Sequence, residues 1–274
     1  MNLTSTNTNS LNGEIICPGD KSISQRILIL GSLLNCDMEI SGFLDANDPN
    51  STLNALNEIG ASIKKSGSKV ILCKRESPFI KPSQNLDLGN SGTGMRLMVG
   101  LISGLGINAT LVGDSSLSKR PMSRVIKPLK EMGAKIQSNE GKSPIEIIES
   151  NISNEFEYKM PIASAQVKSS LILASLSSNN SITIIEPKIT RDHTERMIEY
   201  FGGSVTHSND ESGRIKVNNN KLTSKDSYEI VGDFSSAAFV IVATLISKES
   251  KVVIKNVGLN PSRCGLLEIL VLMG

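Results

Sequence analysis

Four segments rich in Gly, Ser and Asn each stand directly before an apolar run long enough to form a helix. They are PGDKSISQR, LGNSGTGMR, PIASAQVKSS and GDFSSAAF, which begin at residues 18, 88, 161 and 232. Small polar residues at a helix start leave backbone N–H groups able to meet an anion, and the helix dipole favours negative charge there. The same residue types also serve as plain N-caps, so one such segment alone indicates only a helix start.

Cationic side chains accompany these segments in corresponding places, which favours anion binding over simple capping. They are Lys21, Arg26, Arg96 and Lys168 in the first three segments, and Lys119, Arg120, Arg124 and Arg191 before later polar helices. Guanidinium groups bind phosphate or carboxylate bidentately, while Lys supplies a mobile point charge. A chain with a net charge of +2 that places its cations in Gly/Ser loops is suited to small polyanions rather than to nucleic acid.

Other common catalytic arrangements are missing from the sequence pattern. The histidines are His193, which follows Asp192 at a predicted helix start and is interpreted as a neighbour of the cap, and His207, which lies in a strand pattern. No Ser-His-Asp or Cys-His spacing, Walker loop or dinucleotide fingerprint can be argued. The four cysteines are scattered without a CxxC pair, so we expect no metal site, no disulfide and no cofactor.

The elements that must position these segments recur along the chain with a period near seventy residues. The recurrence is clearest at predicted helix ends, where an apolar residue precedes Gly60, Gly133, Gly202 and Gly274. Each unit has the same order: a strand, a Gly/Ser loop opening an apolar helix, a second strand, a polar loop, an amphipathic helix and a hairpin. The apolar helices are predicted over residues 24–34, 93–104, 167–176 and 237–246, and the amphipathic ones include 124–132 and 195–201.

This repeat predicts the α/β fold class, with the apolar helices buried inside a ring of sheets. We place one complete three-unit domain at residues 14–227 and assign residues 1–13 and 228–274 to an incomplete second domain. Hairpin turns are expected at residues 65–68, 139–142 and around 212–213. The polar stretch 218–227 is the best linker candidate.

Composition narrows the protein class. The chain has 274 residues, of which 39% are apolar, 20% are charged and 3% are aromatic, as in ordinary globular proteins with an aliphatic core. The first ten residues lack the charge run and apolar segment of a secretory signal. The longest apolar run, residues 237–246, is too short to span a bilayer. We therefore expect a cytoplasmic protein with no membrane partner.

Several motifs resemble those of the 5-enolpyruvylshikimate-3-phosphate synthase (EPSP synthase) family. They are LGNSGTGMR, KRPM followed by PLKEMGAKI, SAQVKSSLILASL, TRDHTE and GDFSSAAF, in the family's order over residues 13–274. The resemblance is to the branch often called class II. It implies two domains, each an inside-out α/β barrel of βαβαββ-type repeats, with substrates between them. It also implies a monomer that transfers the enolpyruvyl group of phosphoenolpyruvate to the 5-hydroxyl of shikimate 3-phosphate, in the shikimate pathway to aromatic amino acids.

Carried over position by position, the resemblance implies two sets of ligand-binding residues. Shikimate 3-phosphate would contact Lys21, Ser22, Arg26, Ser164, Ala165, Gln166 and Arg191, and phosphoenolpyruvate would contact Lys21, Asn90, Gly92, Arg120 and Gln166. Gly92 would permit a close backbone approach that a Cβ would obstruct. Because glyphosate-insensitive members commonly carry Ala there, the resemblance also implies that a complete enzyme with Gly92 is a glyphosate target.

The resemblance further implies groups that this sequence does not contain. The family's proton-transfer residue and a Lys-Glu-Ser/Thr-Asp-Arg segment belong to the second domain, so the catalytic acid and base are unknown here and we expect the chain alone to be inactive. Two alternatives remain open. One is UDP-N-acetylglucosamine enolpyruvyl transferase, whose usual Lys-Asn pair and Cys-bearing loop are replaced here by Lys21-Ser22 and SSLSKRPM. The other is a non-catalytic truncated scaffold.

Overall fold

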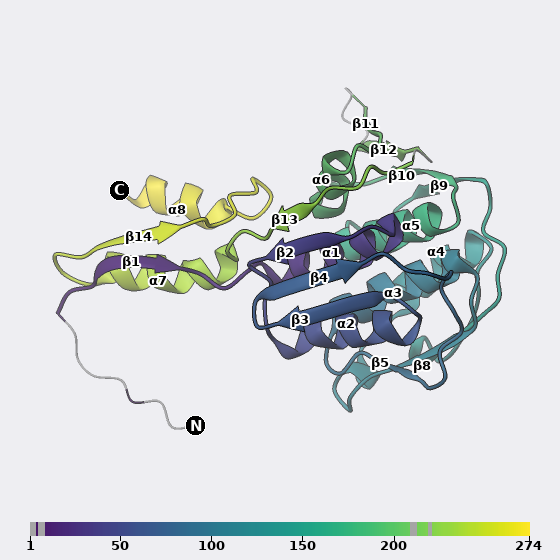
Figure 1. Ribbon diagram of the computed structural model, residues 1–274. Helices are drawn as coiled ribbons and strands as arrows, with labels where there is room; N and C mark the ends of the chain where they lie inside the picture. Colours follow the sequence, from purple (N-terminus) through teal and green to yellow (C-terminus); the bar gives the residue numbers. More distant parts are fainter. Residues whose placement is uncertain (1–3, 5–8, 209–212, 219–220) are drawn as a thin grey trace.

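The computed structural model describes residues 4, 9–208, 213–218 and 221–274, which form a large body and a smaller projecting part (Figure 1). Within these residues, three four-stranded sheets belong to the body and one two-stranded sheet to the projecting part. The core of the body combines side chains from all three sheets and their helices. No helix of the described residues is both long and apolar enough to cross a membrane.

The three sheets of the body share one strand order. The first sheet contains β2 (Met38–Ser41), β3 (Ser62–Ser66), β4 (Lys69–Cys73) and β13 (Ser227–Glu229); the second contains β5 (Leu86–Asp87), β6 (Ala109–Val112), β7 (Lys135–Asn139) and β8 (Lys142–Ile148); the third contains β9 (Glu155–Lys159), β10 (Ser181–Ile185), β11 (Val205–His207) and β12 (Arg214–Val217). The orders are β13-β2-β4-β3, β5-β6-β8-β7 and β9-β10-β12-β11. In each sheet the first two strands are parallel and the rest antiparallel. The predicted α/β repeat is therefore confirmed.

Two kinds of helix alternate along the body. The buried ones are α1 (Lys21–Leu34), α3 (Gly92–Leu105) and α5 (Ala165–Ser177), and the amphipathic ones are α2 (Asn47–Glu58), α4 (Ser123–Glu131) and α6 (His193–Tyr200). Helix α1 has a continuous buried run from Ser24 to Ser32, as expected for a helix with neighbours on every side. The buried helices start one to three residues earlier than predicted, because their capping residues stand before the first apolar position.

Close contact between α3 and α5 depends on glycine. A Cβ built on Gly100 would lie 2.1 Å from the carbonyl oxygen of Ser170, and one on Gly104 would lie 2.1 Å from that of Ala174. Real Cβ atoms do not approach backbone atoms this closely, so only glycine permits this helix separation. The contact packs α3 closely against α5.

Glycines end the amphipathic helices, as the repeat predicted. Gly60, Gly133 and Gly202 follow α2, α4 and α6 with φ angles of +94°, +110° and +74°. This left-handed region is strained for residues with a Cβ and common for the glycine that closes a helix. The regular spacing of these glycines therefore has a conformational cause.

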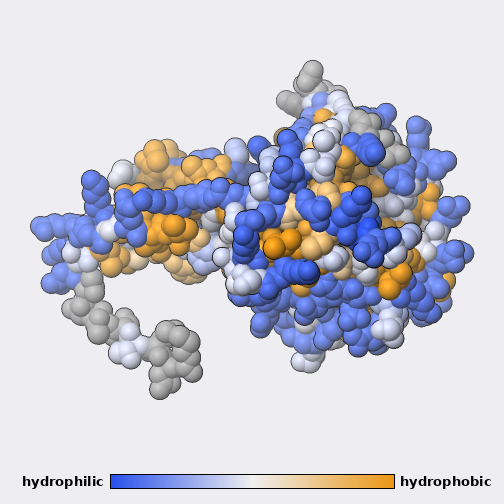
Figure 2. Space-filling view, in the orientation of Figure 1, coloured by the Kyte–Doolittle hydropathy of each residue, from blue (hydrophilic) through white to orange (hydrophobic). Residues whose placement is uncertain are grey.

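The projecting part contains β1 (Asn12–Ile16), α7 (Phe234–Ile246), β14 (Lys251–Lys255) and α8 (Gly265–Met273). Strand β1 pairs with β14 in parallel, although they lie at opposite ends of the sequence. Figure 2 shows apolar side chains on the visible face of this part. The exposed large apolar residues here include Phe239, Leu245, Ile246, Leu259, Val271 and Leu272.

The structure differs from the sequence expectations at the junction of the two parts. Strand β13 completes the first sheet of the body by pairing with β2. The described part of the 218–227 stretch is also held, because Leu222 packs on the core and Thr223 donates its N–H to the carbonyl of Phe201. The hairpin turns at 65–68 and 139–142 are present, whereas the one around 212–213 lies partly outside the described residues. The division into two domains stays a proposal.

Candidate anion-binding site

The starts of α3 and α5 have neutral caps. The Oγ of Ser91 accepts the N–H of Gly94 at 3.0 Å, and the Oγ of Ser164 accepts that of Val167 at 3.5 Å. A neutral cap leaves the positive end of the helix dipole without a compensating charge. These two helix starts are therefore suited to an anion.

The starts of α1 and α7 differ from those of α3 and α5. Here the caps are carboxylates: Asp20 accepts the N–H of Ile23 at 2.9 Å, and Asp233 accepts that of Ser235 at 2.8 Å. A carboxylate at the cap already satisfies the dipole. Lys21, the first residue of α1, forms a 3.0 Å ion pair with Asp48 and is the nearest cation to this start along the chain.

Gln166 and Arg96 connect the starts of α5 and α3. Arg96 donates from Nη1 to Oε1 of Gln166 at 2.7 Å, and Gln166 donates from Nε2 to Oγ1 of Thr93 at 2.9 Å. A Cβ built on Gly92 would lie 3.1 Å from Nη1 of Arg120 and 3.3 Å from Nη1 of Arg96. The structure therefore brings Gly92, Arg120 and Gln166 together.

Within the part of the chain that the structure describes, the guanidinium groups around Gly92 have no carboxylate partner. None of the ion pairs formed between described residues involves Arg96, Arg120, Arg124 or Arg191. The pKa of Arg96 is lowered, first by burial and then by the positive charges of Arg124 and Arg120. Mutual repulsion of this kind is relieved when an anion binds between the groups.

Asp114 is a residue of this site that sequence reasoning missed. Its carboxylate accepts N–H groups from Ser116 at 3.0 Å and Leu117 at 2.7 Å, and it accepts Nδ2 of Asn90 at 2.7 Å. Asn90 in turn accepts a hydrogen bond from Arg120. These bonds lower the pKa of Asp114, with the Leu117 N–H as the largest cause. The sequence did contain a signal for this role, because an Asp side chain often accepts the backbone N–H two residues later in a turn, as Asp114 does from Ser116.

A surface cavity of about 540 Å³ lies beside the start of α5. Its lining includes Ser164, Ala165, Gln166 and Arg191 from the body and Ser262 from the projecting part. The pKa of Arg191 is lowered, first by burial and then by Arg263, while Asp20 and Asp233 oppose the shift. The predicted residues of the third unit therefore share one cavity.

Arg26 is almost enclosed, with 4% of its surface exposed. It donates to Oγ1 of Thr194 at 2.9 Å, to Oγ of Ser169 at 3.0 Å and to the carbonyl of Ser22 at 3.0 Å. Burial lowers its pKa to about 10, which still leaves it charged near neutral pH. The structure therefore shows a largely buried arginine that joins α1 to α5 and α6, and its contact with shikimate 3-phosphate stays a prediction.

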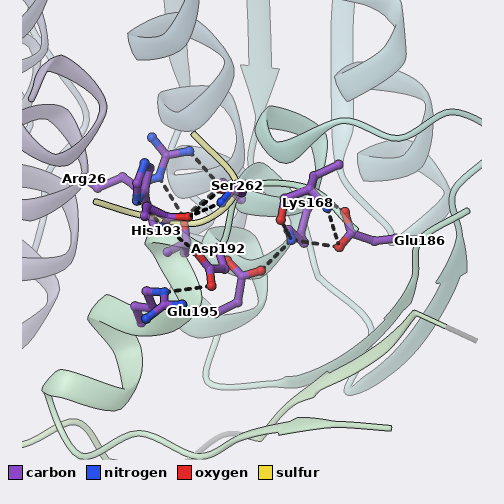
Figure 3. A network of polar contacts seen from close by, with 12 residues as sticks. Arg26, Lys168, Glu186, Asp192, His193, Glu195 and Ser262 are labelled. Atoms are coloured by element: carbon purple, nitrogen blue, oxygen red, sulfur yellow. Dashed lines mark hydrogen bonds and ion pairs between the residues drawn. The ribbon is translucent and has the colours of Figure 1, made fainter. Parts of the chain in front are cut away.

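Lys168 does not accompany a cap as a free cation, and this corrects the sequence expectation. Its ammonium lies 2.8 Å from a carboxylate oxygen of Glu186 and 2.6 Å from one of Glu195, and all three side chains are 1% exposed. Figure 3 shows Lys168 between these two carboxylates. Burial raises the pKa of Glu195, while Lys168 lowers it. Lys168 is therefore paired inside the protein and is not available to a ligand.

His193, which sequence reasoning treated as a neighbour of the cap, is the first residue of α6 and is buried. Its Nδ1 lies 3.4 Å from Nδ2 of Asn260, which also donates to Asp192 at 2.7 Å. Asn260 belongs to the projecting part, so this contact fastens the two parts beside the cavity. The other histidine, His207, is exposed on β11. No group of residues in the described ranges has the arrangement of a metal site.

Comparisons with known proteins agree on one relationship. Residues 5–274 match the family model described as EPSP synthase (3-phosphoshikimate 1-carboxyvinyltransferase). The 3-phosphoshikimate 1-carboxyvinyltransferase of Petrotoga mobilis is 45% identical over all of this chain and 64% of its own length, and that of Streptococcus uberis is 44% identical over 98% and 63%. A solved EPSP synthase from Acinetobacter baumannii superposes with a TM-score of 0.86 at 37% identity, over 97% of this chain and 60% of that one.

Proposed function

This chain belongs to the EPSP synthase (3-phosphoshikimate 1-carboxyvinyltransferase) family, and from that membership we propose that it forms the binding surface for the two phosphorylated substrates of that reaction. It spans 60–64% of the length of the relatives it matches. The reaction of the whole protein would transfer the enolpyruvyl group of phosphoenolpyruvate to the 5-hydroxyl of shikimate 3-phosphate and release phosphate. The UDP-N-acetylglucosamine alternative is not favoured, because the relatives are named for the shikimate reaction.

The observation that supports this proposal best is the set of guanidinium groups around the starts of α3 and α5 that have no carboxylate partner among the described residues. Both substrates carry phosphate and carboxylate groups, which such cations bind bidentately. In the proposed arrangement, shikimate 3-phosphate lies along Ser164, Ala165, Gln166 and Arg191, with Lys21, Ser22 and Arg26 at its other side. Phosphoenolpyruvate lies at Asn90, Gly92 and Arg120, and Gln166 and Lys21 reach both substrates. We further propose a monomeric, cytoplasmic enzyme.

The chemical contribution of these residues is positioning and charge stabilisation. Two anions must approach each other before the enolpyruvyl group can move, and cations fixed by the fold lower the cost of that approach. Gln166 is already oriented by Arg96 and Thr93, so little ordering is needed when a substrate binds. The proton-transfer groups are not assigned to residues of this chain.

Titration calorimetry with shikimate 3-phosphate tests the binding proposal. We expect saturable binding to the chain itself, and a tenfold to hundredfold weaker affinity for Arg191→Gln, about the value of a charged hydrogen bond. Arg214→Gln is the matched control, because Arg214 lies on β12 and is paired with Glu157 at the surface. Equal affinities for the Arg191 and Arg214 variants, or no heat of binding to the parent, would count against the proposal.

Gly92→Ala tests the proposed phosphoenolpyruvate position. The added methyl would press on the guanidinium groups of Arg120 and Arg96, at 3.1 Å and 3.3 Å. We expect roughly tenfold weaker binding of phosphoenolpyruvate in the presence of shikimate 3-phosphate, with the affinity for shikimate 3-phosphate unchanged. A complete enzyme carrying Gly92 should also be inhibited by glyphosate. Full activity of that enzyme in millimolar glyphosate would contradict the assignment.

A further inference from the structure

Lys168, Glu186 and Glu195 form a buried cluster, and none of them is among the residues proposed to contact the substrates. Removing charges from water is costly, and a buried ion pair can often be replaced by apolar residues without loss of stability. Stability alone therefore does not account for three ionisable side chains that are each 1% exposed. Their neighbours suggest another role.

The cluster joins three elements that each lead to the proposed shikimate 3-phosphate cavity. Lys168 lies on α5, two positions after Gln166. Glu186 directly follows β10, and Glu195 lies on α6, four positions after Arg191. Figure 3 shows Glu186 and Glu195 approaching Lys168 from two sides. The relative positions of Gln166 and Arg191 therefore depend on this cluster.

Thr190 is the point at which the cluster holds the loop before α6. Its hydroxyl donates to Oε1 of Glu186 and its N–H donates to Oε2 of the same residue at 3.5 Å. Lys168 donates to the carbonyl of Thr190 at 3.5 Å. The N–H, the hydroxyl and the carbonyl of Thr190 are thus all hydrogen-bonded to Glu186 or Lys168. Arg191 is the next residue in the chain.

Packing contributes little to the position of this loop. Residues 187–189 are exposed, and Ile189 is 80% exposed. Residues 188–190 line the 540 Å³ cavity, and they also line a second cavity of about 550 Å³ that contains Lys168 and Glu186 in its wall. A segment with a cavity on each side has few apolar contacts to fix it. Its polar anchors must do so.

We propose that Lys168 and Glu186, supported by Glu195, are positioning residues that fix Thr190 and thereby hold the Arg191 guanidinium in the shikimate 3-phosphate cavity. This inference rests on the proposed function for its ligand. The cluster acts through Thr190 and Arg191 and touches no substrate itself. A preorganised guanidinium binds more tightly because less ordering is needed on binding.

Thr190→Val tests the inference with a change that keeps the shape of the side chain and leaves the buried charges paired. We expect the dissociation constant for shikimate 3-phosphate to rise about tenfold, and hydrogen exchange of the amides of residues 188–191 to become faster. Thr206→Val, at an exposed position on β11, is the matched control and should change neither quantity. Parent-like exchange in the loop of Thr190→Val would overturn the inference, as would parent-like affinity.

A second variant separates positioning from a purely structural role. Replacing the cluster together, as Lys168→Met, Glu186→Leu and Glu195→Leu, removes all three buried charges and is expected to leave a folded protein. We expect this folded variant to bind shikimate 3-phosphate at least tenfold more weakly, and its loop to exchange faster. A stable variant with parent-like binding would show that the cluster serves folding only. If the parent itself binds no shikimate 3-phosphate, the proposed function fails, and the exchange rates in the loop alone decide whether the cluster positions it.

Discussion

A methyl group at Gly100 is expected to lower the free energy of unfolding by about 2 kcal/mol, because it has no room between α3 and α5. The built Cβ lies 2.1 Å from the carbonyl oxygen of Ser170 and 2.6 Å from its Oγ. Backbone atoms cannot turn aside as the end of a flexible side chain can, so the helices must separate. At an open helix position the same change would add about 1 kcal/mol of stability, so the expected loss is a net value.

Denaturant unfolding of Gly100→Ala against the parent measures this loss. Gly265→Ala is the matched control, because Gly265 is also in a helix and its Cβ would meet nothing within 4 Å. Gly104→Ala should repeat the loss, since its Cβ would lie 2.1 Å from the carbonyl of Ala174. If Gly100→Ala and Gly265→Ala proved equally stable, the close packing of α3 on α5 would be wrong.

Separation of α3 from α5 should also displace residues of the candidate anion-binding site. Ser170 donates its hydroxyl to the carbonyl of Arg96 at 2.8 Å, which ties α5 to the turn of α3 that carries the guanidinium. Arg96 in turn holds Gln166. We therefore expect the Gly100 variant to bind shikimate 3-phosphate more weakly even at temperatures where it is fully folded.

Acid is expected to destabilise the protein through His193. Burial lowers the pKa of this side chain from 6.5 to about 4, with Arg26 as the next cause, while Asp20 and Asp192 oppose the shift and Arg263 adds to it. The folded-state pKa is below the unfolded value, so the unfolded chain takes up the proton first. The neutral imidazole therefore contributes to the free energy of unfolding above pH 6.5, and this contribution is lost as the pH falls towards 4. The total loss over this interval is about 3 kcal/mol.

Unfolding free energies measured between pH 7 and pH 4 for the parent and for His193→Gln check this expectation. The variant should lose less stability over the interval, whatever its stability at pH 7, because it has no imidazole to protonate. His207→Gln, which alters the exposed histidine on β11, should follow the parent. Identical slopes for the parent and the His193 variant would mean that the imidazole is not buried as described.

The repeat could be predicted because its signals are local. Glycines that close helices at Gly60, Gly133 and Gly202, and apolar helices without a polar face, are visible within short stretches of sequence. The pairing of β13 with β2, and of β1 with β14, could not be predicted in the same way. Each pair joins segments nearly two hundred residues apart or more, and no local pattern determines such partners.

In the candidate site, too, some residues could be predicted from the sequence and others could not. The motifs singled out Gly92, Arg120, Gln166 and Arg191. The structure places the first three near one another, and Gln166 and Arg191 line one cavity. Lys168 was misread because its sequence setting resembles that of the other cations, while its partners stand 18 and 27 positions later. One signal was present: a lysine within a helix that is otherwise apolar and small must be paired if it is buried.

The chain enters and leaves the body at a single place. The N–H of Asp20 donates to the carbonyl of Val231 at 2.9 Å, and the N–H of Asp233 donates to that of Pro18 at 2.8 Å. A polypeptide whose ends adjoin in this way can be rejoined across them and opened elsewhere without a long spacer. Residues 18–232 thus have the geometry needed for circular permutation, and the turn at Gly67, where a Cβ would meet nothing within 4 Å, is a natural position for new termini.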